Sequence, residues 1–347
     1  MSFAVPNCSK KSINRAGQAL INESASQQAR TEALALITHW RSCHAYPVNT
    51  FQATLRGRVR KVCDGALVAQ RLKRIPSMEK KLRIIEGMQL VRMQDIGGLR
   101  AVVDTVPQVR KLQAMYSDGS LTHELIDTDD YIQTPKESGY RSVHLIYKYK
   151  NPVATPYDGL HLELQIRTRL QHAWATAVET IGTFLNQALK SNEGPAEWLY
   201  YFKVVSAAFA LIEKTSLPEE FFGWTPARIV QTCIGLERDL DVRRKLQAFA
   251  VAAKAINSSK AKGSYHLIVL NPTDRTVFVE SFGKRRLTEA NEAYAKAELL
   301  GSVRGEDIQT VLVATDTVGS LRRAYPNYFL DTRQFISALA RIPRLAQ

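Results

Sequence analysis

Hydrophobic residues recur every three to four positions over residues 9–44, with polar residues between them. This spacing is typical of helices that bury one face, and Ser9 and Ser24 are the expected N-caps. Pro47 is expected to end this helical unit, because proline interrupts the hydrogen bonds of a helix interior.

The middle of the chain changes between the helical period and the two-residue period of strands. A strand is predicted over residues 66–75, followed by a helix with Ser77 as its N-cap. Further strands are predicted at residues 99–106, 123–132, 142–150 and 160–168. A helix follows the first of these four strands, and a long helix follows the last. This order predicts an α+β fold in which helices flank a mixed sheet.

The pattern changes again after residue 194, where two long helical stretches precede a predicted hairpin, an Ala-rich helix, a strand and a last helix. We therefore expect a helical region and a small α/β domain to follow the central domain. The expected divisions are 1–49 (helical segment), 50–194 (central domain), 195–260 (helical region) and 261–347 (small α/β domain).

Charge adds a preference for polyanionic partners, because the 347-residue chain has a formal net charge of +14. Only Asp64 and Glu79 oppose a run of basic residues between positions 56 and 83. This imbalance favours a phosphate-binding surface over a solvated helix face. The run comprises Arg56, Arg58, Arg60, Lys61, Arg71, Lys73, Arg74, Lys80, Lys81 and Arg83.

Targeting and metal signals are few. No apolar run reaches the ~20 residues that span a membrane, and the N-terminus has no secretory h-region, so the cytoplasm is the expected location, with no membrane partner. His39, Cys43 and His44 could begin a zinc site, but no CxxC or second ligand pair follows. Ordinary helix packing is the favoured interpretation of these three residues.

Two segments before residue 101 have the chemistry of a nucleotide site. Arg71 and Lys73 share one face of a strand, and Ser77 and Lys81 lie one turn apart on the following helix, where an N-terminus favours anions. Asp95 precedes Gly97 and Gly98, so a carboxylate and an accessible backbone would meet at the end of a strand. By itself this second segment is explained equally well by a turn.

Two later segments add an aromatic loop and a polar strand face. Tyr140 lies in a loop with Lys136, Arg141 and His144, which suits stacking on a base and contact with phosphates. Strict alternation over residues 160–168 places His161, Glu163, Gln165 and Arg167 on the face opposite the leucines. Glu163 could complete a metal site with Asp95, and an exposed strand face is the alternative.

Together these four segments resemble, at matching spacing over residues 50–190, the synthetase domain of the RelA/SpoT alarmone enzymes. The Arg-x-Lys, Ser and Lys positions match Arg71 to Lys81, and Asp-Ile-x-Gly-x-Arg matches Asp95 to Arg100. The acceptor loop matches Asp130 to His144, the Glu-x-Gln-Ile-Arg-Thr strand matches Glu163 to Thr168, and Gln-His-x-Trp-Ala matches Gln171 to Ala175.

The resemblance implies a nucleotidyltransferase-like sheet and transfer of the β,γ-pyrophosphate of ATP to a ribose 3′-hydroxyl. Arg71 and Arg100 would sandwich the adenine, and Asp95 and Glu163 would bind Mg²⁺. Glu163 would also activate the attacking hydroxyl, and Tyr140 would stack on the acceptor base. The ATP phosphates would be held by Lys73, Ser77 and Lys81. The residues near the acceptor would be Lys136, Arg141, His144, Gln165 and Arg167.

Departures from the family also carry expectations. No His-Asp metal pattern of the HD hydrolase occurs in residues 1–50, which predicts synthesis without hydrolysis. The helix after Trp174 keeps only Glu179 of an acidic stretch common in the family. The stretch at residues 324–339 looks like fused toxin–antitoxin synthetases of the CapRel type. That likeness implies a regulatory C-terminal part that restrains the enzyme until a phage protein is sensed.

Two acceptors remain open from the sequence. GDP or GTP would give (p)ppGpp, which the intact Tyr140 loop favours, whereas the 3′ end of tRNA would make the protein a translation toxin, which the basic charge favours. A catalytically silent nucleotide- or RNA-binding regulator on the same fold is the alternative from a different class. Paired Asp95 and Glu163 argue against it, because a silent binder needs no metal carboxylates.

Overall fold

The structure, a computed structural model, describes residues 3–185, 194–246, 265–271, 276–283, 285–304, 308–314 and 332–346. Its helices are α1 (Lys10–Ile21), α2 (Gln27–Cys43), α3 (Ala45–Arg60), α4 (Ile75–Ile84), α5 (Val106–Ser117), α6 (Arg169–Leu185), α7 (Ala196–Glu213), α8 (Pro226–Asp239), α10 (Leu287–Arg304) and α12 (Arg333–Leu339). Its strands are β1 (Leu67–Leu72), β2 (Gly97–Val103), β3 (Glu124–Asp130), β4 (Val143–Lys148), β5 (His161–Thr168), β6 (Tyr265–Asn271), β7 (Thr276–Phe282) and β8 (Gln309–Ala314).

The strands form one eight-stranded sheet in the order β3-β4-β5-β2-β1-β8-β6-β7. Strands β2 and β5 are parallel, whereas the other neighbouring pairs are antiparallel, so the predicted mixed sheet and the α+β class are confirmed. The order β4-β5-β2-β1 brings the strands with the family motifs side by side. Strand β8 continues the sheet from β1, so the described strands after residue 260 share this sheet instead of forming their own.

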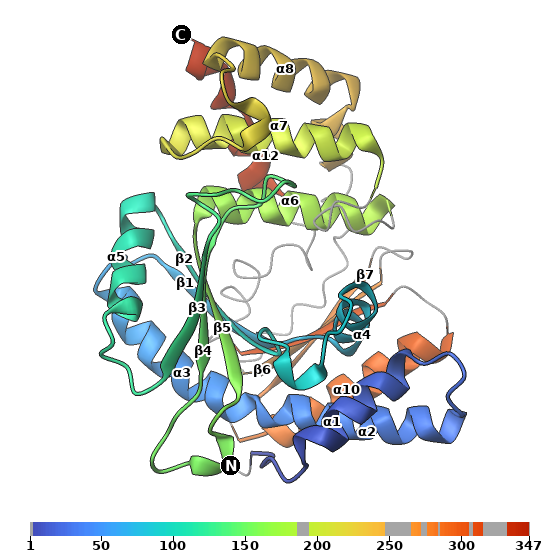
Figure 1. The fold of residues 1–347 in the computed structure, drawn as a ribbon. Helices are drawn as coiled ribbons and strands as arrows, with labels where there is room; N and C mark the ends of the chain where they lie inside the picture. The colour runs from blue at the N-terminus through green and yellow to red at the C-terminus, as the bar shows by residue number, and fades with distance from the viewer. Residues whose placement is uncertain are drawn as a thin grey trace.

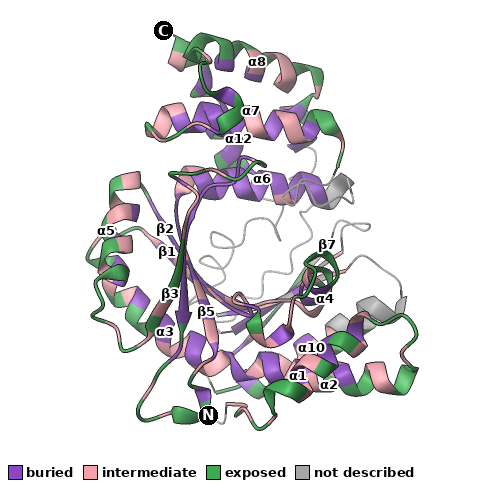
Figure 2. Ribbon diagram, viewed as in Figure 1, coloured by how far each residue is buried: buried purple, intermediate pink, exposed green. Residues whose placement is uncertain are grey.

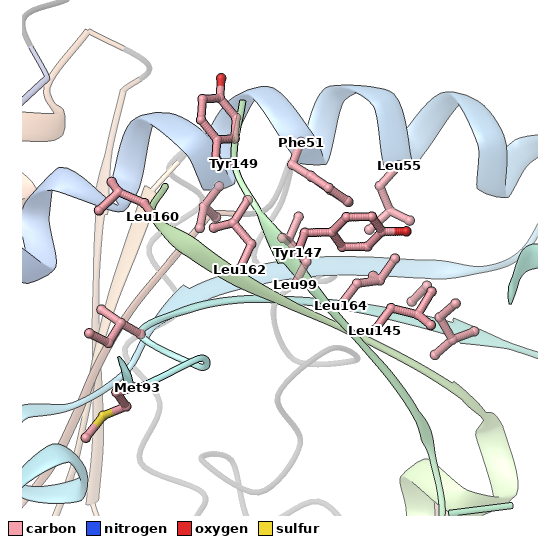
Figure 3. Close-up of a cluster of buried hydrophobic side chains, with 14 of the residues drawn as sticks. Phe51, Leu55, Met93, Leu99, Leu145, Tyr147, Tyr149, Leu160, Leu162 and Leu164 are labelled. Carbon is pink, nitrogen blue, oxygen red and sulfur yellow. The ribbon is translucent and has the colours of Figure 1, made fainter. Parts of the chain in front are cut away.

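The first hydrophobic core lies between the sheet and helices α3 and α5, which pack on β1, β2 and β5. Phe51 and Leu55 of α3 face Leu162 and Leu164 of β5, and the ring of Phe51 lies 5.2 Å from that of Tyr147 (Figure 3). Strict alternation of β5 causes this arrangement, because every second residue points to the same face. The residues between the leucines therefore face the other side of the sheet.

A second core joins helices α6, α7, α8 and α12, which are stacked at the end of the molecule opposite α1 and α2 (Figure 1). Their facing sides are buried, as Figure 2 shows in purple. Trp174 of α6 donates a hydrogen bond from Nε1 to the carbonyl of Phe202 on α7, at 2.9 Å. A third, smaller core joins β6, β7 and α10, and Arg41 of α2 lies 4.2 Å from the ring centre of Tyr294 in α10.

Three of the predicted helix boundaries are wrong. Ser26, not Ser24, caps α2, accepting a hydrogen bond from the backbone N–H of Ala29. Pro47 lies in the first turn of α3 instead of ending a helix, and Ser77 lies in the first turn of α4, whose N-cap is Arg74. The reason is common to both prolines: first-turn N–H groups have no intrahelical partner, so Pro47 and Pro76 cost nothing there.

Other predictions about the ends of the chain have mixed outcomes. Ser9 is confirmed as the N-cap of α1, and α3 runs across the expected division between residues 49 and 50. The predicted hairpin is confirmed as β6 and β7, whose turn lies outside the described residues, as does most of the stretch at 324–339. Cys43 is buried, and its thiol contacts the carbonyl of His39. None of the described helices is long and apolar enough to cross a bilayer.

Candidate functional site

A cavity of about 420 Å³ opens on the face of the sheet opposite the Leu162 and Leu164 side chains. It lies over β1, β2, β4 and β5, and residues from α4 and the loop before β4 complete its wall. The lining residues are Arg71, Lys73, Lys81, Gln94, Asp95, Gly98, Leu99, Arg100, Asp129, Tyr131, Lys136, Tyr140, His144, Ile146, Glu163 and Gln165.

Cations surround the first carboxylate of the cavity. Lys73 Nζ lies 2.6 Å from Asp95 Oδ2, and Lys81 Nζ lies 3.0 Å from Asp95 Oδ1. Burial by itself would raise the pKa of the Asp95 carboxyl, but attraction to Lys73 outweighs it and lowers that pKa. Burial also lowers the pKa of Lys73, with Asp95 opposing the change. Asp95 is therefore ionised at neutral pH and holds two ammonium groups at the mouth of β2.

The second carboxylate is part of a polar network on β4 and β5. Glu163 Oε1 lies 2.9 Å from His144 Nδ1, and Glu163 Oε2 accepts a hydrogen bond from Gln165 Nε2 at 2.8 Å. Burial opposes ionisation, but His144 lowers the pKa of Glu163 to about 2. Burial likewise lowers the pKa of His144, but Tyr140 and Glu163 together raise it to about 9. The pair is thus a carboxylate and an imidazolium at neutral pH.

Strand pairing places the remaining predicted donor residues beside these carboxylates. Gly98 of β2 pairs with Arg71 of β1 on one side and with Glu163 of β5 on the other. Arg100 pairs with Gln165 in the same way, and its Nε lies 3.4 Å from Gln165 Oε1. Because paired residues point to the same face, Arg71, Arg100 and Glu163 share one wall of the cavity.

The aromatic loop forms the opposite wall. Tyr140 is only 4% exposed, and its hydroxyl lies 2.9 Å from His144 Nε2. Its ring meets those of Tyr131 and His144 edge-on. Tyr131 is more exposed than Tyr140, and Lys136 Nζ lies 4.2 Å from the Tyr131 ring centre. The structure thus places Tyr140 in the wall and presents Tyr131 with Lys136 to the cavity.

Three predicted site residues do not line the cavity. Ser77 lies in the first turn of α4, away from the lining. Arg141 is 3% exposed and points toward α7, where its Nη2 donates to the carbonyl of Ser216 at 3.0 Å. Arg167 is 2% exposed and contacts His172 Nδ1 of α6. Burial lowers the pKa of Arg141 to about 10 and that of Arg167 to about 9.

Sequence reasoning missed three lining residues: Gln94, Asp129 and Tyr131. Gln94 directly precedes Asp95, and Asp129 and Tyr131 lie in the segment of the aromatic loop. A signal for Tyr131 was available, because an aromatic residue between acidic residues and a Pro-Lys loop suits a ligand site. Nothing comparable marked Gln94.

The Gly-Gly pair before Leu99 divides into two roles. A Cβ at Gly97 would lie 2.7 Å from Val48 Cγ2 and 2.8 Å from Leu162 Cδ2, so Gly97 permits close packing of α3 against β5. A Cβ at Gly98 would meet nothing closer than the Arg71 carbonyl oxygen, at 3.7 Å. Gly98 faces the cavity, so only this second glycine provides the close backbone approach to a ligand expected of both.

The two glycines make a matched pair of variants. Gly97→Ala is expected to destabilise the protein by about 1–3 kcal/mol, because the added methyl overpacks the core. Gly98→Ala is expected to leave the free energy of unfolding almost unchanged and to weaken ATP binding instead. Urea denaturation and ATP titration of both variants would test this, and equal destabilisation by the two changes would contradict it.

Asp95 and Glu163 fit a magnesium site by the chemistry of their donor atoms. Both carboxylates line one cavity, and the charge of Glu163 acts to raise the pKa of Asp95, which places the two groups close together. Mg²⁺ is commonly held by one or two carboxylates together with substrate phosphates. Among the described residues no group of three or more His, Cys, Asp or Glu side chains could hold a metal, so phosphate oxygens would have to complete the coordination.

Comparison with known proteins identifies the region that contains the cavity. Residues 70–182 match the family model described as a region found in RelA and SpoT proteins. The chain therefore contains a RelA/SpoT region, as the sequence motifs predicted. All the lining residues of the cavity lie within it.

Curated relatives share this region. The chain is 35% identical over 112 residues to GTP pyrophosphokinase YjbM of Bacillus subtilis, covering 31% of this chain and 52% of the relative. It is 30% identical over 112 residues to GTP pyrophosphokinase YwaC of the same organism, covering 31% and 51%. The matched part thus spans about half the length of these relatives.

Among solved structures, small alarmone synthetase 1 of Bacillus subtilis bound to its product pppGpp aligns with a TM-score of 0.42 and 24% identity. The alignment covers 50% of this chain and 90% of that one.

Proposed function

We propose that the protein is an ATP-dependent pyrophosphokinase that transfers the β,γ-pyrophosphate of ATP to the 3′-hydroxyl of a guanine nucleotide, giving (p)ppGpp. The observation that carries this proposal is the gathering of Arg71, Lys73, Lys81 and Arg100 around Asp95 and Glu163 in one cavity. Two relatives that match the same region are named GTP pyrophosphokinases. We place the reaction in the cytoplasm, which holds both nucleotides.

The donor side follows from the cations. Lys73 and Lys81, now on Asp95, are placed to exchange that carboxylate for the phosphates of ATP, and Arg71 and Arg100 offer planar guanidinium groups that can stack on the adenine. Bound Mg²⁺, held by Asp95 and Glu163, would neutralise charge on the transferred group. Positioning and charge stabilisation are the main requirements of such a transfer.

The acceptor side follows from Glu163 and the aromatic loop. A carboxylate with a pKa near 2 is a weak base, so we assign Glu163 to orient the 3′-hydroxyl by accepting its hydrogen bond. His144 holds the carboxylate in place, and its raised pKa keeps it from accepting the proton. Tyr131, Tyr140 and Lys136 surround the space left for the base.

The 3′ end of tRNA is the second candidate acceptor, favoured by the net charge of +14. Restraint by the C-terminal region and its release by a phage protein stay predictions. So does the absence of hydrolysis, which incubation of the protein with purified ppGpp would test.

The test is to incubate the protein and Mg²⁺ with γ-labelled ATP and either GTP or deacylated tRNA. Label is expected to move to GTP, with a product that comigrates with pppGpp. Label on tRNA alone would replace the acceptor by the second candidate. Label on neither, with ATP still bound, would reject transfer and support a silent nucleotide-binding regulator.

A further inference from the structure

We propose that helix α7, which lies outside the RelA/SpoT region, positions the aromatic wall of the cavity, and that Ser206 is the positioning residue. The part of the wall concerned is the segment Lys136 to Ser142, called here the acceptor loop. This inference rests on the proposed function, because it assigns that loop to the acceptor side of the cavity.

The first contact joins helix and loop at the level of the backbone. Ser206 is 2% exposed, and its hydroxyl donates a hydrogen bond to the carbonyl of Gly139 at 2.5 Å. Gly139 has a φ of +85°, and a Cβ there would lie 2.8 Å from Ser206 Cβ. The loop therefore needs glycine twice over, for its backbone conformation and for its approach to α7.

Two further contacts hold the loop on either side of Gly139. Lys203 Nζ of α7 lies 3.7 Å from Glu137 Oε1, and Arg141 Nη2 donates to the carbonyl of Ser216, which follows α7, at 3.0 Å. The Arg141 contact is buried, so its loss would leave a guanidinium without solvent. The loop is thus attached to the α7 region before, at and after its glycine.

The ring of Tyr140 belongs to the core of the helical layer. It shares the apolar cluster of α6, α7, α8 and α12, whereas the neighbouring strands belong to the core beneath the sheet. Tyr140 then contacts His144 at 2.9 Å, and His144 contacts Glu163 at 2.9 Å. A continuous series of contacts runs from Ser206 through Gly139, Tyr140 and His144 to Glu163.

This arrangement predicts an effect on the acceptor but not on ATP. Lys73, Lys81 and Asp95 lie on α4 and next to β1 and β2, and none of their printed contacts involves α7. A change at Ser206 should therefore alter the loop while leaving the donor side unchanged. A purely structural Ser206 would instead lower stability without separating the two substrates.

The experiment uses the full chain with Ser206→Ala, the near-isosteric Ser206→Cys, and Thr176→Val as control. Thr176 is also buried, lies on α6 of the same layer, and gives its hydroxyl to the carbonyl of His172. KM for GTP is expected to rise about three- to tenfold in Ser206→Ala, the factor expected for one lost hydrogen bond. Ser206→Cys should be intermediate, and Thr176→Val should keep the wild-type KM for GTP.

KM for ATP is expected to stay within about twofold of wild type in all three variants. Hydrogen exchange gives a readout independent of activity: amides of the acceptor loop should exchange faster in Ser206→Ala, while those of β5 do not. If Ser206→Ala does not fold, Ser206→Cys carries the same comparison.

An unchanged KM for GTP, or equal increases for GTP and ATP, would overturn the positioning role. Inactive wild-type protein would instead refute the proposed function, and loop exchange would then decide the positioning role alone.

Discussion

Replacing Glu163 with glutamine is expected to lower the rate of pyrophosphate transfer at least about a hundredfold while the protein stays folded. The amide keeps the shape of the side chain but loses the charge that attracts a divalent cation and the oxygen that orients the attacking hydroxyl. His144 loses its anionic partner as well. ATP binding should partly survive, because Lys73 and Lys81 belong to the Asp95 side of the cavity.

The measurement is the initial rate of label transfer from γ-labelled ATP, with ATP affinity measured separately by titration. Glu124→Gln is the matched control, since Glu124 is an exposed glutamate on β3, outside the cavity lining. Asp95→Asn should behave like Glu163→Gln, because both carboxylates are assigned to one metal site. Turnover within a fewfold of wild type in both variants would remove that assignment.

Ending the chain before residue 195 is expected to abolish soluble, cooperatively folded protein. The truncation would expose the buried face of α6, including Trp174, Val178 and Ile181, and would leave β1 as an unpaired edge where β8 now lies. Burial of each large apolar side chain contributes about 1.5–3 kcal/mol. Losing several is comparable to a total stability of about 5–15 kcal/mol, and an open edge strand favours aggregation.

Soluble yield and thermal unfolding by circular dichroism would measure the effect. The matched control is co-expression of residues 1–190 with residues 191–347, which should restore a soluble complex if lost contacts are the cause. A truncated chain that unfolds cooperatively as a monomer would contradict the prediction. The expected regulatory role of the C-terminal region is better tested at Ser206, because truncation changes folding and activity together.

Local patterns were reliable where one face of an element is buried. Alternation in β5 placed Leu162 and Leu164 in the core and Glu163 and Gln165 over the cavity. Helix starts were less reliable, because Pro47 and Pro76 looked like breaks and instead occupy first turns. Proline interrupts a helix only where an N–H is needed, and the sequence does not say where a helix begins.

Long-range packing explains the predicted site residues that do not line the cavity. Arg167 lies on the polar face of β5, but α6 returns over the end of that strand and buries it against His172. Arg141 adjoins Tyr140 in the loop, yet it turns toward α7 because the carbonyl of Ser216 lies there. Neither helix contact is encoded in the spacing of residues around the motif.

By itself, the sequence determined the order of strands and helices, the RelA/SpoT motifs, and the set of cations and carboxylates that share the cavity. These are properties of side-chain type and short-range period, which a motif preserves. The tertiary structure alone decided that β8 extends the catalytic sheet and that Tyr140 is packed by α7. Both depend on contacts between segments more than 60 residues apart, whose pairing is set by how whole surfaces fit.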